Sequence, residues 1–513
     1  MSERLGRLAA IVRADFLIRL RRPSTAVVFL LLSAIPYWWI PDPSTGRALM
    51  EIHGKRALYN SATIGMATAL LATMFIGLAG FYVVSNALRR DILSRCGFVI
   101  ASTTMRGSEY LIGKFAGNVV FLSVFTAGFM VTSMAMVLVR GEAPLEPFLF
   151  AKQYLLLVPP SIFFVSAIAV LFECVPWLSG KFGDIVYFIV WMTMMGFAAG
   201  ANSKPFDVGG FAFMRTQLHT DSLSIGATTF DANKGTYAFP GMEPTFAELA
   251  ARLAMLLWPV VLLVVARLFF HRFDPARVRV ATHKEKRTWL GRFNALSKPL
   301  ARLLTGAARA VVPASGSFAG SALSDAIMTI AAFPLTAVAM LGVTIASVFV
   351  EPRKILPIAF AAAAIAIADI ASREKRAGTS ALVYAAPYAL RTRFVAWKFT
   401  SAVIVALLFL VVPIARIALS TPTQLPSFAI GILFLTAAAT ALGIASATPK
   451  TFIVLFLTFW YLVINDNGKT PAFDVAGFYG AATPAVTITY AALGVAMLTA
   501  AHVFHAVQLK REW

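Results

Sequence analysis

Charged residues are scarce in this chain and cysteine is almost absent. Only 13% of the 513 residues are Asp, Glu, Lys or Arg, while 59% are hydrophobic. A water-soluble domain of this length does not need so much apolar surface, so a soluble globular protein is excluded. The two cysteines, Cys96 and Cys174, are too few for a disulfide scaffold, and we expect both to be packing residues. The solvent for most of the chain is therefore predicted to be lipid.

Patterns for catalysis and nucleotide binding are missing as well. A phosphate-binding loop needs Gly-x-x-x-x-Gly-Lys-Ser/Thr, and the near match at Gly468-Lys469-Thr470 has Val463 in place of the first Gly. His502 and His505 share a helical face, but two ligands do not make a metal site, and packing is the better interpretation. Paired carboxylates or a nucleophile with a matching base do not stand out, which makes an enzyme the least favoured class. We expect no cofactor in this chain.

What the sequence does contain is a series of long apolar segments, which predicts an all-α polytopic membrane protein. A helix needs about 20 apolar residues to cross a hydrocarbon core about 30 Å thick. Twelve segments are candidates, approximately 24–40, 61–84, 115–139, 154–177, 185–199, 250–270, 334–350, 355–370, 394–418, 427–445, 452–464 and 482–507. The segments 355–370 and 452–464 fall below the usual minimum length and are the least secure. We predict about twelve transmembrane helices in two pseudo-symmetric six-helix halves.

The basic residues indicate how the chain is oriented. The net charge is +21, and the Lys and Arg residues alternate from loop to loop instead of forming one face. By the positive-inside rule this distribution places both termini on the cytoplasmic side of a bacterial-type inner membrane. The natural partner of this charge is anionic membrane lipid, and we do not expect nucleic acid to bind.

Three regions follow from these patterns. Residues 1–272 form the first half, and its segment 1–22 is predicted to be an interfacial amphipathic helix with Leu8, Val12 and Phe16 on one face. Residues 273–317 form a basic cytoplasmic linker. Residues 318–513 form the second half.

Charged residues recur at matching positions of the two halves. The distance from Arg90 to Lys114 matches that from Arg373 to Lys398 within about one residue. The matched positions are Asp15 with Asp325, Arg90 with Arg373, Asp91 with Glu374, Lys114 with Lys398, and Lys181 with Lys450. This order predicts a tandem duplication with the same topology in both halves, as a pseudo-two-fold transporter requires.

The stretch from Arg89-Arg90-Asp91 through Arg106-Gly107-Ser108-Glu109 to Gly113-Lys114 resembles the loop after the second span in the ABC-2 type permease family. The second copy, from Arg373-Glu374 to Lys398, has Trp397 where the first has Gly113. The resemblance covers both halves in layout and about thirty residues of motif in each half. Twelve spans in one chain depart from the usual six, which implies two permeases fused in tandem.

This resemblance implies a transport subunit, most often an exporter, here of a hydrophobic or amphipathic cargo. It implies that two copies of a separate cytoplasmic ATPase bind the ATP and Mg. In that family the loop after the second span docks on the ATPase, and the loop before the fifth span makes a smaller contact. The residues assigned to ATPase coupling by resemblance are Arg90, Asp91, Arg95, Arg106, Glu109, Lys181, Glu374, Lys375, Arg376, Arg391, Arg393 and Lys450.

Other interpretations stay open. These charges could be ordinary positive-inside residues next to span ends. A major-facilitator-like secondary carrier also has six plus six spans, but its loop after span two is short and contains a Gly-x-x-x-Asp-Arg-x-Gly-Arg-Arg pattern that is missing here. Glu173, Asp184 and Asp369 lie near predicted span ends, where solvation or pairing with Lys181 or Arg373 is expected. We therefore predict no chain of buried ionisable groups of the kind a proton-coupled carrier needs. A non-transport membrane anchor is the third option.

Overall fold

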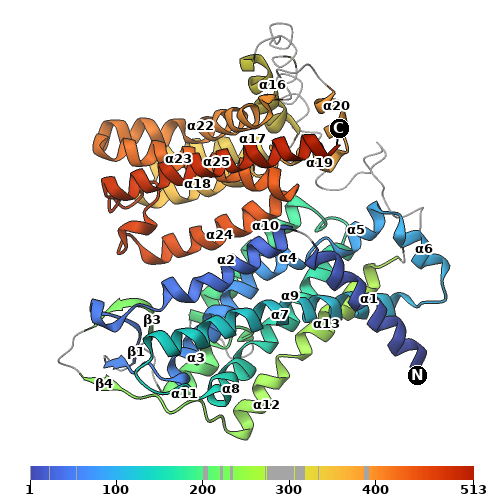
Figure 1. Cartoon of the computed structure of the whole chain (residues 1–513), viewed down its shortest axis with the longest axis vertical. Helices are drawn as coiled ribbons and strands as arrows, with labels where there is room; N and C mark the ends of the chain where they lie inside the picture. The colour runs from blue at the N-terminus through green and yellow to red at the C-terminus, as the bar shows by residue number, and fades with distance from the viewer. Residues whose placement is uncertain are drawn as a thin grey trace. The chain divides into compact units, whose positions relative to one another are not determined.

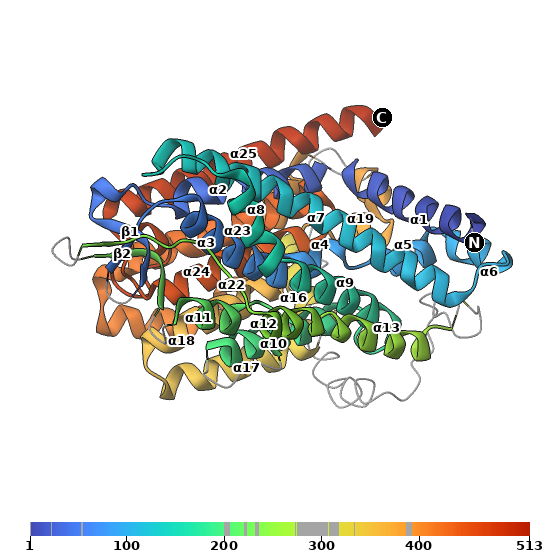
Figure 2. The same ribbon diagram turned by 90° about the horizontal axis from the view of Figure 1, so that it is seen from below.

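In the computed structural model the chain is mostly helical and divides into two compact units, Met1–Thr282 and His283–Trp513. Figures 1 and 2 show the helices of each unit from two directions. The structure describes every residue except 1, 22, 53–54, 200–205, 220–222, 231–234, 272, 274–305, 307–317, 333, 386–391 and 513. The boundary between the units falls in the predicted linker 273–317, most of which lies outside the described residues.

The first unit is built around one long helix, α7. The helices α1 and α2 both pack along α7, α3 packs against α8, and α9 packs against α13. Its helices are α1 (Ser2–Leu20), α2 (Pro23–Trp39), α3 (Ser61–Phe75), the π-helix η2 (Ile76–Gly80), α4 (Phe81–Val84), α5 (Ala87–Leu93), α6 (Cys96–Ser102), α7 (Gly107–Arg140), α8 (Pro147–Leu157), α9 (Pro159–Cys174), α10 (Lys181–Ala199), α11 (Phe211–Leu218), α12 (Phe246–Ala254) and α13 (Leu257–Phe269), with a 3-10 turn η1 (Pro43–Thr45).

A small sheet lies at one end of the first unit, and α1, α5 and α6 lie at the other end (Figures 1 and 2). The strands are β1 (Arg47–Ile52), β2 (Lys55–Ala57), β3 (Leu223–Thr229) and β4 (Thr236–Tyr237), in the order β3-β1-β2-β4. β1 is antiparallel to β3, with Met50 opposite Ile225, while β2 and β4 are parallel. The all-α expectation is therefore incomplete, because two loops 170 residues apart pair outside the helices.

The second unit repeats much of this helix order. Here α16 and α17 both pack along α22, α18 also packs on α22, and α23 packs against α25. Its helices are α16 (Phe318–Ala332), α17 (Pro334–Phe349), α18 (Pro352–Ile367), α19 (Arg373–Ala377), α20 (Ser380–Tyr384), α22 (Phe394–Ser420), α23 (Leu425–Ser446), α24 (Pro449–Asp466) and α25 (Pro484–Glu512), with 3-10 turns η6 (Pro422–Gln424) and η7 (Pro471–Phe473).

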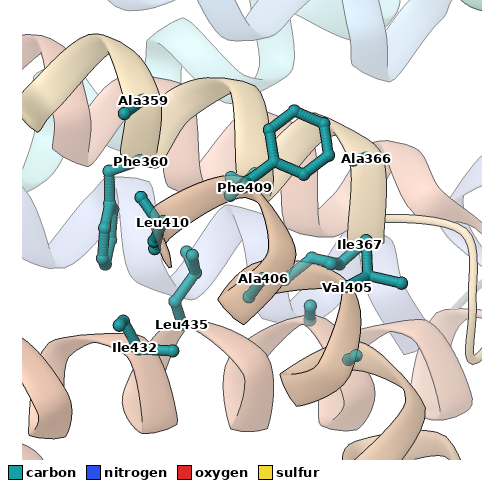
Figure 3. Packing of buried hydrophobic residues seen from close by; sticks show 14 of the residues in the cluster. Ala359, Phe360, Ala366, Ile367, Val405, Ala406, Phe409, Leu410, Ile432 and Leu435 are labelled. Carbon is teal, nitrogen blue, oxygen red and sulfur yellow. The ribbon is translucent and has the colours of Figure 1, made fainter. Parts of the chain in front are cut away.

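The core of the second unit is apolar and rich in alanine. Figure 3 shows Ala359, Phe360 and Ile367 of α18 facing Ala406, Phe409 and Leu410 of α22, with Ile432 and Leu435 of α23 beside them. Small residues at such contacts let the helix backbones approach closely, which is how helices associate where lipid removes the hydrophobic drive between them.

The structure bears out a membrane protein and leaves the number of spans open. Each of the twelve predicted apolar segments overlaps a helix. Among the described residues, seven helices are long and apolar enough to cross a bilayer, and the bent pair α16–α17 makes an eighth at most. The helix of residues 61–92, which combines α3, η2, α4 and α5, is the most deeply buried of the seven. Twelve spans stay a prediction.

The N-terminal helix differs from its predicted form. Leu5 and Leu20 are exposed, whereas Asp15 and Arg19 are buried against α7. Arg19 is buried because its guanidinium donates to the side-chain oxygen of Asn118 (2.6 Å) and to the backbone carbonyl of Val84 (3.3 Å).

The break between α8 and α9 has a clear cause. Pro159 and Pro160 lack the N–H groups that would continue the helical hydrogen bonds, so the preceding carbonyls lose their donors. The buried Arg252 of α12 donates to the Leu156 carbonyl (3.0 Å), whose helical donor would be Pro160, and to the Leu157 carbonyl (2.5 Å), since the Ser161 N–H donates to Val158 instead. A cation is also favoured at the C-terminal end of a helix.

The sheet end of the first unit is held by an ion pair. Both guanidinium nitrogens of Arg56 in β2 donate to the Glu142 carboxylate, at 2.8 and 2.5 Å, and the Tyr59 backbone N–H donates to it at 3.0 Å. Partial burial raises the pKa of Glu142, but the hydrogen bonds and charge of Arg56 outweigh burial, so the pKa lies below its ordinary value. The carboxylate form therefore stabilises the folded state.

We predict that Glu142→Gln lowers the melting temperature at pH 7 and that the difference from wild type disappears in acid. A folded-state pKa below the unfolded value means that the stabilisation is complete above about pH 4.3 and is lost as the pH falls through the folded pKa. Melting of the detergent-solubilised chain between pH 7 and pH 3 tests this, with the exposed Glu146→Gln as control. A difference that does not change with pH would contradict the ion pair.

Candidate functional site

A buried carboxylate joins three helices at the end of the first unit opposite the sheet. Asp15 of α1 accepts from Lys114 of α7 at 2.8 Å and from Arg90 of α5 at 2.7 Å. Lys114 also contacts Asp91 at 2.7 Å, and Arg19 lies 3.5 Å from Asp15. We call these five residues the Asp15 cluster. Because burying unpaired charges is costly, this geometry fixes α1, α5 and α7 to one another.

The second unit contains the matching arrangement. Asp325 of α16 accepts from Lys398 of α22 at 3.0 Å and from Arg373 of α19 at 3.1 Å. Lys398 also pairs with Glu374, and Arg373 lies 3.6 Å from Asp369. We call these five residues the Asp325 cluster. The Lys398 side chain has no exposed surface, so its ammonium depends entirely on these partners for the interactions that water would supply.

The two clusters share an aspartate, a lysine and an arginine in the same arrangement, and they differ in the residues around these three. Four residues after Asp15 stands Arg19, whereas four residues after Asp325 stands Thr329, whose hydroxyl accepts from Arg373 at 2.9 Å. Four residues before Arg373 stands Asp369, whereas four before Arg90 stands Asn86. The named residues therefore carry a net charge of +1 in the Asp15 cluster and −1 in the Asp325 cluster.

Each cluster is followed by a left-handed residue at the same distance along the chain. Five residues after Arg90 and after Arg373, the chain adopts a left-handed conformation, at Arg95 (φ 61°) and Gly378 (φ 71°). This break separates α5 from α6 and α19 from α20. Glycine adopts this conformation freely, whereas arginine does so at a cost, so the first loop keeps the turn despite an unfavourable residue.

The second short helix of each loop exposes one aliphatic side chain. Val99 in α6 is 67% exposed and Leu382 in α20 is 75% exposed. Each lies nine residues after the arginine of its cluster. Neither side chain was among the predicted functional residues. Their equal distance from Arg90 and Arg373 along the chain is the signal that could have found them.

The twelve predicted coupling residues lie in different environments, some within the charge clusters and others on the surface. Asp91 is buried, and Arg90 and Glu374 lie mostly inside the clusters. Arg95, Arg106, Arg376 and Arg393 are exposed, and the Glu109 carboxylate accepts from the Arg106 backbone N–H at the start of α7. Lys375 donates to Gln508 of α25 at 2.6 Å, and Lys181 and Lys450 lie at the starts of α10 and α24. Arg391 lies outside the described residues.

Other sequence expectations have mixed outcomes. Asp369 pairs with Arg373 as expected, while Glu173 accepts from the backbone N–H groups of Ala87 (3.0 Å) and Leu88 (2.6 Å), capping α5. The predicted absence of a chain of buried ionisable groups concerned a proton relay; what the structure shows is one local group of mostly buried charges in each unit, around Asp15 and around Asp325. The His505 ring stacks on Phe394, in keeping with packing. In the described part of the chain, no three His, Cys, Asp or Glu side chains are grouped to hold a metal ion.

Comparison with known proteins adds no relative: no protein-family model, curated protein or solved structure matches the chain.

We predict that Lys398→Met lowers the unfolding free energy by about 3–5 kcal/mol, because removing one partner of a buried ion pair leaves charges uncompensated. The double variant Asp325→Asn/Lys398→Met should cost less than the sum of the two single variants, as expected for residues in one network. Unfolding in mixed micelles measures all three.

The matched control is Lys354→Met in the same unit. Lys354 pairs with Glu351 at 3.2 Å, but both side chains are largely exposed, so this change should cost about 0–1 kcal/mol. Equal costs at Lys354 and Lys398 would show that the Asp325 cluster does not stabilise the unit.

Proposed function

We propose that this chain is the membrane-spanning permease subunit of an ATP-driven transporter, acting with two copies of a separate cytoplasmic ATPase. The observation that carries the proposal is the repeated loop. In each unit a buried charge cluster anchors a short helix, a left-handed residue turns the chain, and a second short helix exposes one aliphatic side chain. Two loops with these features at equal offsets are what two copies of one partner would require.

The proposal assigns different tasks to the two groups of charged residues. Val99 and Leu382 would insert into an apolar pocket of the ATPase, since a fully desolvated anchor contributes most to an interface. Arg95, Arg106, Arg376 and Arg393 would lie at the polar rim and orient the partner. Asp91 and Glu374 would not touch the ATPase, and with Arg90 and Lys375 they would transmit its movement to α7, α22 and α25.

The larger architecture belongs to the same proposal. Matching helix contacts around α7 and α22, together with matching clusters, support two pseudo-symmetric halves that arose by tandem duplication. In such a chain the loops carrying the clusters lie on one side of the membrane, the cytoplasmic side, with both termini. A hydrophobic or amphipathic cargo, moved outward, fits the apolar composition of the helices.

A proton-coupled carrier is the second candidate, because buried ionisable residues in membrane helices often form proton relays. The position of the clusters favours the first proposal. Lys114 lies about 10 Å from the start of α7, and Lys398 about 6 Å from the start of α22, at a rise of 1.5 Å per residue. A relay that carries cargo or protons across the bilayer needs groups near its middle as well.

We predict that Val99→Asp and Leu382→Asp each weaken binding of the partner ATPase at least tenfold, since each places a charge in an apolar pocket. Val99→Leu and Leu382→Val are the matched controls and should bind almost as wild type. Copurification from native membranes followed by mass spectrometry identifies the partner, and titration of the purified ATPase against the chain in nanodiscs measures affinity.

The expected complex has two ATPases for each chain. Replacing Arg90-Asp91 or Glu374-Lys375 by Ala should lower ATP turnover in this complex more than it lowers ATPase binding, because these residues lie behind the contact. A purified chain that moves protons in liposomes without any ATPase, and stops when Asp15 is changed to Asn, would establish the carrier instead.

A further inference from the structure

An arginine near the far end of the central helix in each unit binds the end of an earlier helix, α2 in the first unit and α17 in the second. Arg140 of α7 donates to the backbone carbonyls of Tyr37 (2.7 Å) and Ile40 at the end of α2. Arg416 of α22 donates to the carbonyls of Ser347 and Val350 at the end of α17. In both units the two acceptors are three residues apart. We call Arg140 and Arg416 the helix-end arginines.

This geometry has a direct physical reason. The last carbonyls of a helix have no intrahelical donor, and a cation is favoured beside them. A guanidinium offers several N–H donors in a fixed plane, so one arginine can satisfy two carbonyls. The Arg140 guanidinium also lies 4.9 Å from the centre of the Tyr37 ring. These contacts fix the end of α2 relative to α7. A helix end that only faced lipid would not be held in one position.

In the first unit the other ends of α2 and α7 are joined through the Asp15 cluster. Asp15 ties α1 to Lys114 of α7, and the Thr25 hydroxyl at the start of α2 donates to the Arg19 carbonyl at 2.7 Å. Between the ends, the Phe29 ring of α2 packs against Gly128 of α7, where any side chain would collide with it. The helices α2 and α7 are thus held together at both ends and in the middle.

The charge cluster and the helix-end arginine lie far apart on each central helix. Lys114 and Arg140 are 26 residues apart on α7, which corresponds to about 39 Å, more than the hydrocarbon thickness of a bilayer. Lys398 and Arg416 are 18 residues apart on α22, about 27 Å. Each unit therefore has a contact set at one end of its central helix and another at the opposite end.

We propose that Arg140 and Arg416 are positioning residues that make α2 with α7, and α17 with α22, move as rigid pairs. A displacement at a charge cluster then reaches the far end of the pair through the helix-end arginine. The use of this movement for transport rests on the proposed function, but the mechanical coupling itself does not, and it is present in the chain without any partner.

A double-mutant cycle in the full chain, purified in lipid nanodiscs, tests the coupling. Amide hydrogen exchange of peptides covering residues 37–41 is measured in wild type, Asp15→Asn, Arg140→Gln and the double variant. Asp15→Asn should accelerate exchange of these amides about fivefold or more in the wild-type background. In the Arg140→Gln background exchange is already fast, and Asp15→Asn should add little.

Controls separate this effect from loss of the fold. Peptides covering 346–351 in the other unit must keep their wild-type exchange, and Asp15→Glu, which keeps the charge but shifts it, replaces Asp15→Asn if that variant does not fold. Arg140→Lys should restore part of the coupling because it retains the charge. The same cycle with Asp325→Asn and Arg416→Gln, followed at 346–351, tests the second unit.

Two outcomes would overturn the inference: no response of residues 37–41 to the Asp15 change, or the same response with and without Arg140. Either result would leave the ATPase-driven permease standing, because no ATPase is present. If instead no ATPase is found for this chain, a positive cycle still establishes the coupling between the cluster and the helix end.

Discussion

The shared carboxylate of each unit is the interaction on which the arrangement of its helices depends. Asp15 and Asp325 are removed from water, and each is balanced by a lysine from the central helix and an arginine from a short loop helix. Burying ions costs several kcal/mol apiece, so the arrangement persists only while all partners stay in place. The carboxylate therefore acts on three elements at once, and none of them can shift alone without exposing or stranding a charge.

This constraint explains features that are otherwise unconnected. The helix α1 has exposed leucines and could lie loosely on a membrane surface, yet Asp15 and Arg19 fix it against α7. The helices α5 and α19 are short and would be marginal by themselves. Their positions are set by the clusters, and α5 has an additional cap from Glu173. The left-handed turns that follow begin after these anchored helices, and Val99 and Leu382 are exposed at the same offset along the chain.

The sequence predicted the helices well and the correspondence of the charges well, but not where those charges would lie. Spacing aligns Asp15 with Asp325 and Lys114 with Lys398, and in each unit the aspartate accepts from the lysine. Spacing does not distinguish a lysine in solvent from a buried one, since burial is decided by contacts with helices far along the chain. Of the charges in the clusters, Arg90, Asp91 and Glu374 were therefore predicted at a partner interface, whereas in the structure they pair with buried charges. The strands β1 and β3 were missed for the same reason, because their pairing joins loops separated by four of the predicted spans.

The helix-end arginines could not be matched by their spacing in the sequence, and their unequal spacing helps to distinguish a proton relay from a mechanical connection. Arg140 follows Lys114 by 26 residues, whereas Arg416 follows Lys398 by 18, so no fixed offset relates them. What the two arginines share is that each donates to the last carbonyls of an earlier helix, α2 or α17. This contact is visible only in three dimensions. The central helices α7 and α22 thus carry a charge cluster near one end and a helix-end arginine near the other, at different separations. A proton relay would depend on the distance between successive ionisable groups, whereas a rigid connection does not. The unequal spacing in the two units therefore favours a mechanical role for these charges.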